Sequence, residues 1–156
     1  MGYGFRKIHW LAIIAVIAVA AGAVRNELLG PRIHAVPRRN DDPFTIRFAV
    51  FNPAFTLTFR DIDMTCLPRR IEGHGKDGRA WDAAGQPFPL NVSIDLAPRM
   101  AYEYTCPIKS SASPQQVSRV EVQIITRYTR FGHRAQAKPV TLDWDSASRA
   151  WTVAGN

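Results

Sequence analysis

An alternation of apolar and polar positions runs through most of the chain after residue 43. Apolar side chains at every second position are typical of strands that keep one face on a core. Seven such segments, separated by turn signals, are predicted at 44–50, 57–65, 87–95, 101–106, 117–131, 140–145 and 151–153. Short strands at this spacing predict an all-β fold, an immunoglobulin-like β-sandwich of about seven strands, with a barrel as the alternative.

Three details refine this pattern. The alternation slips by one residue at Asp61, which predicts a β-bulge because a bulge adds one residue to one strand of a pair. The polar, glycine-bearing stretch 68–85 predicts a long loop or an irregular hairpin around Ala80 and Trp81. The run 145–148 predicts the turn before the last strand.

The segment 8–24 has a different pattern, because it is apolar throughout except at His9. No face of a helix built from it would be polar, so it is not an amphipathic helix of a soluble domain. A helix needs about 20 apolar residues to cross a membrane, with roughly 17 as the lower limit. Residues 1–24 therefore predict an export segment with one apolar helix. The membrane-contacting residues predicted in it are Trp10, Ile13, Ile14, Val16, Ile17 and Val19.

Two interpretations of this segment stay open. In the preferred one it is an uncleaved signal anchor. In the alternative it is a signal peptide, cleaved at an A-x-A-like site that Ala21 and Ala23 provide. Arg6 and Lys7 favour a cytoplasmic N-terminus, although arginines also follow the segment. We therefore expect a single-pass membrane protein with its C-terminal domain outside the cytoplasm, or a periplasmic or secreted protein after cleavage.

The expected organisation has three parts. Residues 1–24 form the export segment, 25–43 a linker, and 44–156 the sandwich domain. The linker contains one glycine and three prolines without a persistent period, which predicts a partly extended spacer.

Cys66 and Cys106 end the second and fourth predicted strands. An even pair of cysteines in an exported chain is a disulfide candidate. Closing a loop of this length would stabilise the fold by on the order of 4 kcal/mol in the chain-entropy model. Two thiolates without a neighbouring Cys-x-x-Cys or His-x-x-x-His pattern are too few for a zinc site, so no metal site is predicted.

The net charge of +7 is spread along the chain, and no nucleic-acid-binding motif accompanies it. The four histidines share no local motif with a serine or a cysteine, and no G-x-S-x-G sequence occurs. The glycine-rich run 73–79 lacks the spacing of a phosphate-binding loop. We therefore predict no catalytic residues, no cofactor and no nucleic-acid partner, and a protein that is not an enzyme.

One family resemblance follows from four short motifs. They are 48–53 (FAVFNP), 57–66 with its core Asp61-Ile62-Asp63-Met64, the turn Asp77-Gly78, and 96–98 before Tyr102 and Tyr104. This pattern resembles the FxLYD-type and late-embryogenesis-abundant type 2 (WHy-like) exported β-sandwich domains. Residues 71–73 stand where those domains have a Leu-Tyr-Asp run. The resemblance implies a sandwich that is not an enzyme, and it transfers no catalytic residue.

The predicted function is that of a non-enzymatic cell-envelope protein with a periplasm-facing interaction domain on a membrane anchor. Its expected partners are the membrane, through the N-terminal helix, and another envelope protein. Edge strands and the aromatic residues Trp81, Tyr102 and Tyr104 are the predicted contact surfaces. The alternative is a secreted or periplasmic ligand-binding module that is released after signal cleavage; the ligand is not identifiable from the sequence.

Overall fold

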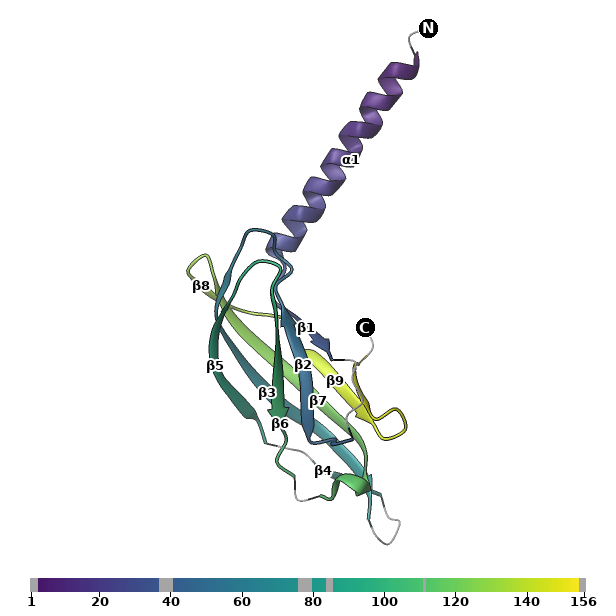
Figure 1. Cartoon of the computed structure of the whole chain (residues 1–156), viewed down its shortest axis with the longest axis vertical. Helices are drawn as coiled ribbons and strands as arrows, with labels where there is room; N and C mark the ends of the chain where they lie inside the picture. Colours follow the sequence, from purple (N-terminus) through teal and green to yellow (C-terminus); the bar gives the residue numbers. More distant parts are fainter. Residues whose placement is uncertain (1–2, 37–40, 76–79, 84–85, 111, 155–156) are drawn as a thin grey trace.

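A computed structural model describes residues 3–36, 41–75, 80–83, 86–110 and 112–154. An N-terminal helix projects from one end of a mostly β body (Figure 1). The elements are α1 (Tyr3–Leu28), β1 (Arg32–Ala35), β2 (Thr45–Phe51), β3 (Phe59–His74), β4 (Ala80–Ala83), β5 (Phe88–Leu96), β6 (Ala101–Pro107), a 3-10 turn (Pro114–Gln116), β7 (Val117–Arg130), β8 (His133–Gln136), β9 (Val140–Asp145) and β10 (Ala150–Val153).

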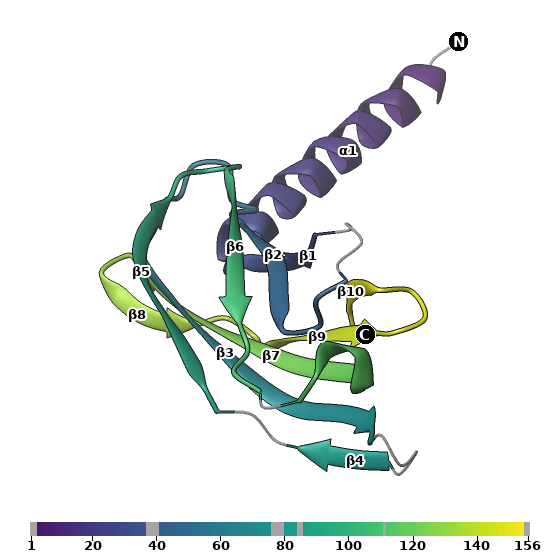
Figure 2. The same cartoon turned by 60° about the horizontal axis from the view of Figure 1, so that its bottom comes forward.

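The strands form two antiparallel sheets that pack as a β-sandwich (Figure 2). The smaller sheet has the order β1-β2-β6. The larger sheet has the order β10-β9-β7-β3-β4, and in addition β5 pairs with β3 and β8 pairs with β7. The long strands β3 and β7 are the centre of this sheet, since every other strand in it pairs with one of them or with β9. The predicted β-sandwich with one N-terminal helix is thus confirmed.

The core follows from the alternation in the sequence. In β2 the side chains of Ile46, Phe48 and Val50 are fully buried, while the residues between them are partly or fully exposed. The same period brings inward the apolar side chains of β3, β7 and β9, which include Ile62, Met64, Val120, Val122, Ile124, Leu142 and Trp144. Inward-facing residues of both sheets therefore fill the single core, as in other two-sheet folds.

The predicted bulge is present. The pairing of β3 with β5 shifts between Phe59 and Ile62, and the pairing of β3 with β7 shifts between Arg60 and Asp63. Asp61 has φ 49°, in the left-handed region, which asparagine and aspartate enter more readily than other side chains do. Arg134 of β8 donates hydrogen bonds to the Asp61 carbonyl oxygen (2.8 Å) and to Asp63 Oδ2 (3.0 Å). The bulge is therefore held from the neighbouring hairpin.

The structure contains three short strands in addition to the seven predicted ones. Strand β8 extends the hairpin after β7, and β4 pairs with the far end of β3, so the stretch predicted as a loop or irregular hairpin is a hairpin over its described residues. Strand β1 lies inside the predicted linker and pairs with β2. With a single buried apolar side chain, Ile33, the four-residue β1 is too short to show a period in the sequence.

Helix α1 also extends past the apolar segment, to Leu28. The Leu29 N–H donates to the Arg25 carbonyl oxygen at 3.1 Å, which closes the last turn. The helix ends there because Gly30 and Pro31 follow, and a proline cannot donate the next hydrogen bond. Only residues 29–31 separate the helix from β1.

Candidate binding groove

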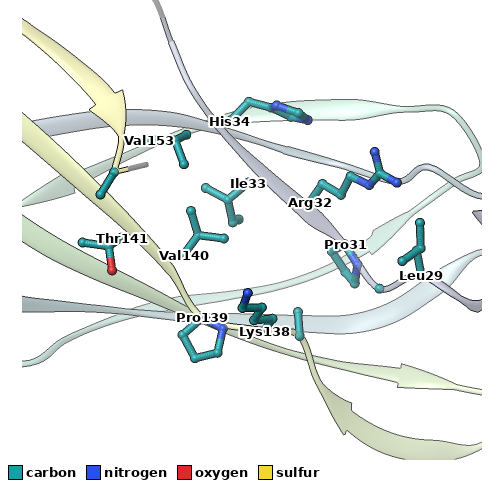
Figure 3. Close-up of a pocket in the computed structure, with 13 residues that line it drawn as sticks. Leu29, Pro31, Arg32, Ile33, His34, Lys138, Pro139, Val140, Thr141 and Val153 are labelled. Atoms are coloured by element: carbon teal, nitrogen blue, oxygen red, sulfur yellow. The ribbon is translucent and has the colours of Figure 1, made fainter. Parts of the chain in front are cut away.

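One pocket lies on the side of the sandwich where the helix joins it. It has a volume of about 510 Å³ and opens between the two sheets. Its lining comes from the connection 29–31, from β1, from residues 137–141 and from the end of β10 (Figure 3). We call this pocket the β1–β10 groove.

The groove exists because the two sheets end here without a shared strand. Strand β1 is the terminal strand of the small sheet, and β10 is the terminal strand of the large one. Ile33, Val140 and Val153 gather in the middle of the groove (Figure 3). Ile33 is 7% exposed and Val153 is 42% exposed, so the apolar surface continues from the core out to solvent.

The rim of the groove is basic. Arg32 and Lys138 are exposed, and His34 is exposed with its ring 6.2 Å from that of Phe51. Among the described residues that line the groove, none is acidic. An apolar floor with a cationic rim favours an occupant with apolar side chains and negative charge.

One end of the groove is fixed to the core. A Cβ atom on Gly30 would lie 2.6 Å from Tyr128 Oη, so the backbone at Gly30 packs directly on that side chain. Tyr128 is itself 5% exposed, and its ring meets that of Phe59 edge-on at 5.0 Å. The helix–strand connection therefore rests on a rigid part of the core, and this end of the groove is preformed.

Another opening, of about 320 Å³, is lined by Ile94 and Asp95 of β5 and by Tyr102 and Tyr104 of β6. Tyr102 is exposed, while Tyr104 is half-buried and packs 6.1 Å from Phe48. Burial, and then the neighbouring Tyr102, raise the pKa of Tyr104 above its ordinary value. The two predicted contact tyrosines thus share one sheet edge. The side chain of Trp81, the third, lies outside the described residues.

The two cysteines form a disulfide that joins the sheets. Cys66 lies in β3 of the large sheet and Cys106 in β6 of the small sheet, and both are fully buried. Their Cα atoms are 6.6 Å apart, and 40 positions separate them in the sequence. The bond therefore ties the two layers together through the core.

The predicted membrane-contacting residues all lie in α1 and are exposed. Trp10, Ile13, Ile14, Val16, Ile17 and Val19 expose between 49% and 73% of their surface. Ala21, from the alternative cleavage site, is exposed in the same helix, and the side chain of Ala23 lies outside the described part of the chain. Within the described residues, the structure has no helix with the length and apolarity needed to span a membrane.

Two aspartates of β9, Asp143 and Asp145, make local contacts. Asp143 pairs with Arg119 at 3.1 Å, and this carboxylate raises the pKa of Arg119. Asp145 accepts hydrogen bonds from the Ser148 hydroxyl and from the backbone of Ala147 and Ser148, and these lower its pKa and form the predicted turn. Over the described ranges, no group of three histidine, cysteine or acidic residues could hold a metal ion.

Sequence reasoning did not find the groove. Pro31 and Ile33, which line the groove, and the nearby Val36 are buried, although they lie in the stretch that the sequence predicts as a spacer. The sequence does contain a signal for this burial. Apolar residues recur at every second or third position of this polar, proline-containing stretch, and a solvated linker does not need such a pattern.

Comparison with known proteins adds little. No protein-family model and no curated protein sequence matches the chain. A solved structure with some similarity is that of Spo0M, a sporulation control protein from Bacillus subtilis. It is 15% identical, the match covers 69% of this chain and 48% of Spo0M, and the TM-score is 0.32. The chain thus spans about half the length of that protein.

Proposed function

We propose that this chain is a non-enzymatic, membrane-anchored protein of the cell envelope whose β-sandwich binds another envelope protein on the periplasmic side. The β1–β10 groove is the observation that carries this proposal. It combines an apolar floor, a basic rim and two sheet edges, and it adjoins the exposed apolar helix. The buried disulfide supports a location outside the cytoplasm, since such bonds persist in oxidising compartments.

An extended peptide segment fits the groove better than a compact surface does. A peptide that runs beside β1 would hydrogen-bond to an edge strand, and every second side chain would point to the apolar floor. Acidic residues in that segment would face Arg32 and Lys138 at the rim. We therefore propose an extended, acidic and partly apolar segment of an envelope protein as the partner.

Photo-cross-linking from β10 tests this proposal. A photoreactive residue at Val153, which lines the groove, is expected to form an adduct with one protein in membranes of cells that express the full chain. The matched control is the same photoreactive residue at Thr152, which is also exposed. Thr152 is next to Val153 in β10, so its side chain points to the opposite face of the strand. The double variant Arg32→Glu, Lys138→Glu is expected to reduce the Val153 adduct severalfold, because it reverses the charge of the rim.

The result against this proposal is equal adduct formation from Thr152 and Val153, or an adduct that the charge reversal leaves unchanged. Either would show that the groove does not select the partner. The thermal midpoint of the double variant serves as the folding control, since both replaced side chains are exposed.

A ligand-binding module released after signal cleavage is the second candidate. The volume of the groove favours it, because about 510 Å³ lies in the range of small-molecule sites. In that case an anionic amphiphile would take the place of the peptide, and the cross-link would reach a small molecule instead of a protein.

A further inference from the structure

The end of the sandwich nearest α1 carries exposed apolar side chains on three separate connections. Phe55 lies between β2 and β3, Met100 between β5 and β6, and Phe131 between β7 and β8. They expose 53%, 47% and 71% of their surface. These connections lie at the end of the body from which the helix leaves (Figures 1 and 2). We call Phe55, Arg99, Met100, Arg130 and Phe131 the helix-side tip.

Two turns of the tip hold large side chains where glycine or asparagine is usual. Phe131 and Gly132 form a two-residue hairpin loop with φ 51° and 76°, which fits a type I′ turn. Arg99 has φ 61° at the third position of the turn that the Met100 N–H closes onto the Ala97 carbonyl oxygen at 3.2 Å. A bulky residue in this region is strained. Burial of Phe131 in the core does not offset the strain, since that side chain is exposed.

Arginines lie directly beside the exposed aromatic rings. The Arg99 guanidinium carbon is 5.1 Å from the ring centroids of both Phe51 and Phe55, and that of Arg130 is 5.7 Å from the Phe131 centroid. Arg25 adds a cation in the last turn of α1. The carboxylate of Asp63 lies 3.0 Å from Arg134 and 4.0 Å from Arg127. The tip thus combines exposed apolar side chains with cations.

The connection to α1 keeps the tip close to the end of the apolar segment. From Val24 to β1 the chain has one helical turn and residues 29–31. These can span at most about 16 Å, at 1.5 Å per helical residue and about 3.4 Å per extended one. The headgroup layer of a bilayer is about 5–8 Å thick on each side. If the apolar segment lies in a membrane, the end of the sandwich beside it is held within about 16 Å of the edge of the hydrocarbon core, in or next to the headgroup layer.

We propose that the helix-side tip is a membrane-contacting surface that inserts Phe55, Met100 and Phe131 among anionic phospholipid headgroups. Arg99 and Arg130 bind the lipid phosphates while the apolar side chains reach the acyl boundary, as in other interfacial anchors. This inference rests on the proposed membrane anchor. Contact at the tip fixes the orientation of the sandwich, so that the β1–β10 groove faces sideways along the membrane.

An environment-sensitive fluorophore on a single introduced cysteine tests this surface. The native cysteines are joined in a disulfide, so in Phe131→Cys only the new thiol reacts. The full chain is reconstituted into phosphatidylcholine vesicles with and without phosphatidylglycerol. We expect a blue-shifted emission that brominated lipids quench, and a larger shift with phosphatidylglycerol. Ala147→Cys, in the exposed turn between β9 and β10, is the control and is expected to give no shift.

The outcomes separate this inference from the anchor itself. If the protein floats with the vesicles and the label at position 131 stays as exposed to water as the label at 147, the inference is wrong and the anchor stands. If the protein does not float with either vesicle, both are wrong. The double variant Arg99→Gln, Arg130→Gln tests the role of the two arginines. If the emission shift at position 131 no longer grows with phosphatidylglycerol in this variant, the role is supported. If the shift grows with phosphatidylglycerol as much as in the parent protein, the role is contradicted.

Discussion

Replacing Cys66 and Cys106 together with alanine is expected to lower the free energy of unfolding by about 4 kcal/mol. The bond closes 40 positions of sequence and joins β3 to β6 across the core, so its loss frees the unfolded chain and leaves the two sheets without a covalent link. Both side chains are fully buried, so the smaller alanines also leave unfilled space. Urea titration of the full chain in detergent, followed by the fluorescence of the buried Trp144 and Trp151, measures the change.

Two further measurements make this prediction sharp. Wild-type protein that is unfolded and refolded under reductant should lose most of the same stability, because its core keeps both sulfurs and only the link is absent. Thiol titration of denatured, non-reduced protein should find no reactive thiol. Two reactive thiols would show that the disulfide does not form in the cell. The disulfide would then no longer support a location in an oxidising compartment.

Replacing Asn52 with alanine is expected to cost about 2–4 kcal/mol of stability. The Asn52 amide is fully buried and donates to the Leu57 and Leu96 carbonyl oxygens, both at 2.8 Å. Its Oδ1 accepts from the Ala54 N–H at 2.9 Å. The side chain thus ties the β2–β3 connection to the end of β5, and alanine leaves these backbone groups without their partner.

Two other variants isolate the buried hydrogen bonds of Asn52. Asn52→Asp keeps the shape but puts a carboxylate against two carbonyl oxygens, so it should cost more than alanine at neutral pH. Gln123→Ala removes an amide that bonds the exposed Arg69, and it should cost less than about 1 kcal/mol. Equal thermal midpoints for Asn52→Ala and Gln123→Ala would contradict the structural role given to Asn52.

Most strands of the sandwich could be predicted from the sequence because they are half-buried. Where a strand has one face on the core, as in β2, alternation is complete and the strand can be read directly. The bulge at Asp61 was readable for the same reason, since a one-residue slip moves every later side chain to the other face. The cysteines could be paired because only two exist.

What the sequence could not show is how elements meet. The groove depends on β1 and β10 becoming the ends of two different sheets on the same side, which is a property of sheet order. The helix-side tip depends on three connections, centred on Phe55, Met100 and Phe131, that are far apart in the chain. Single exposed apolar residues are common on protein surfaces, so none of the three stood out before the fold brought them together.

The membrane anchor is the central claim, because the proposed roles of the groove and of the helix-side tip both require the sandwich to be held at a membrane. Mass spectrometry of the mature N-terminus, after separation of membrane and soluble fractions, tests it most directly. The account predicts a chain that retains residues 8–24 and sediments with the membrane. A chain that begins at Val24 in the soluble fraction would contradict it, and would favour the released ligand-binding module.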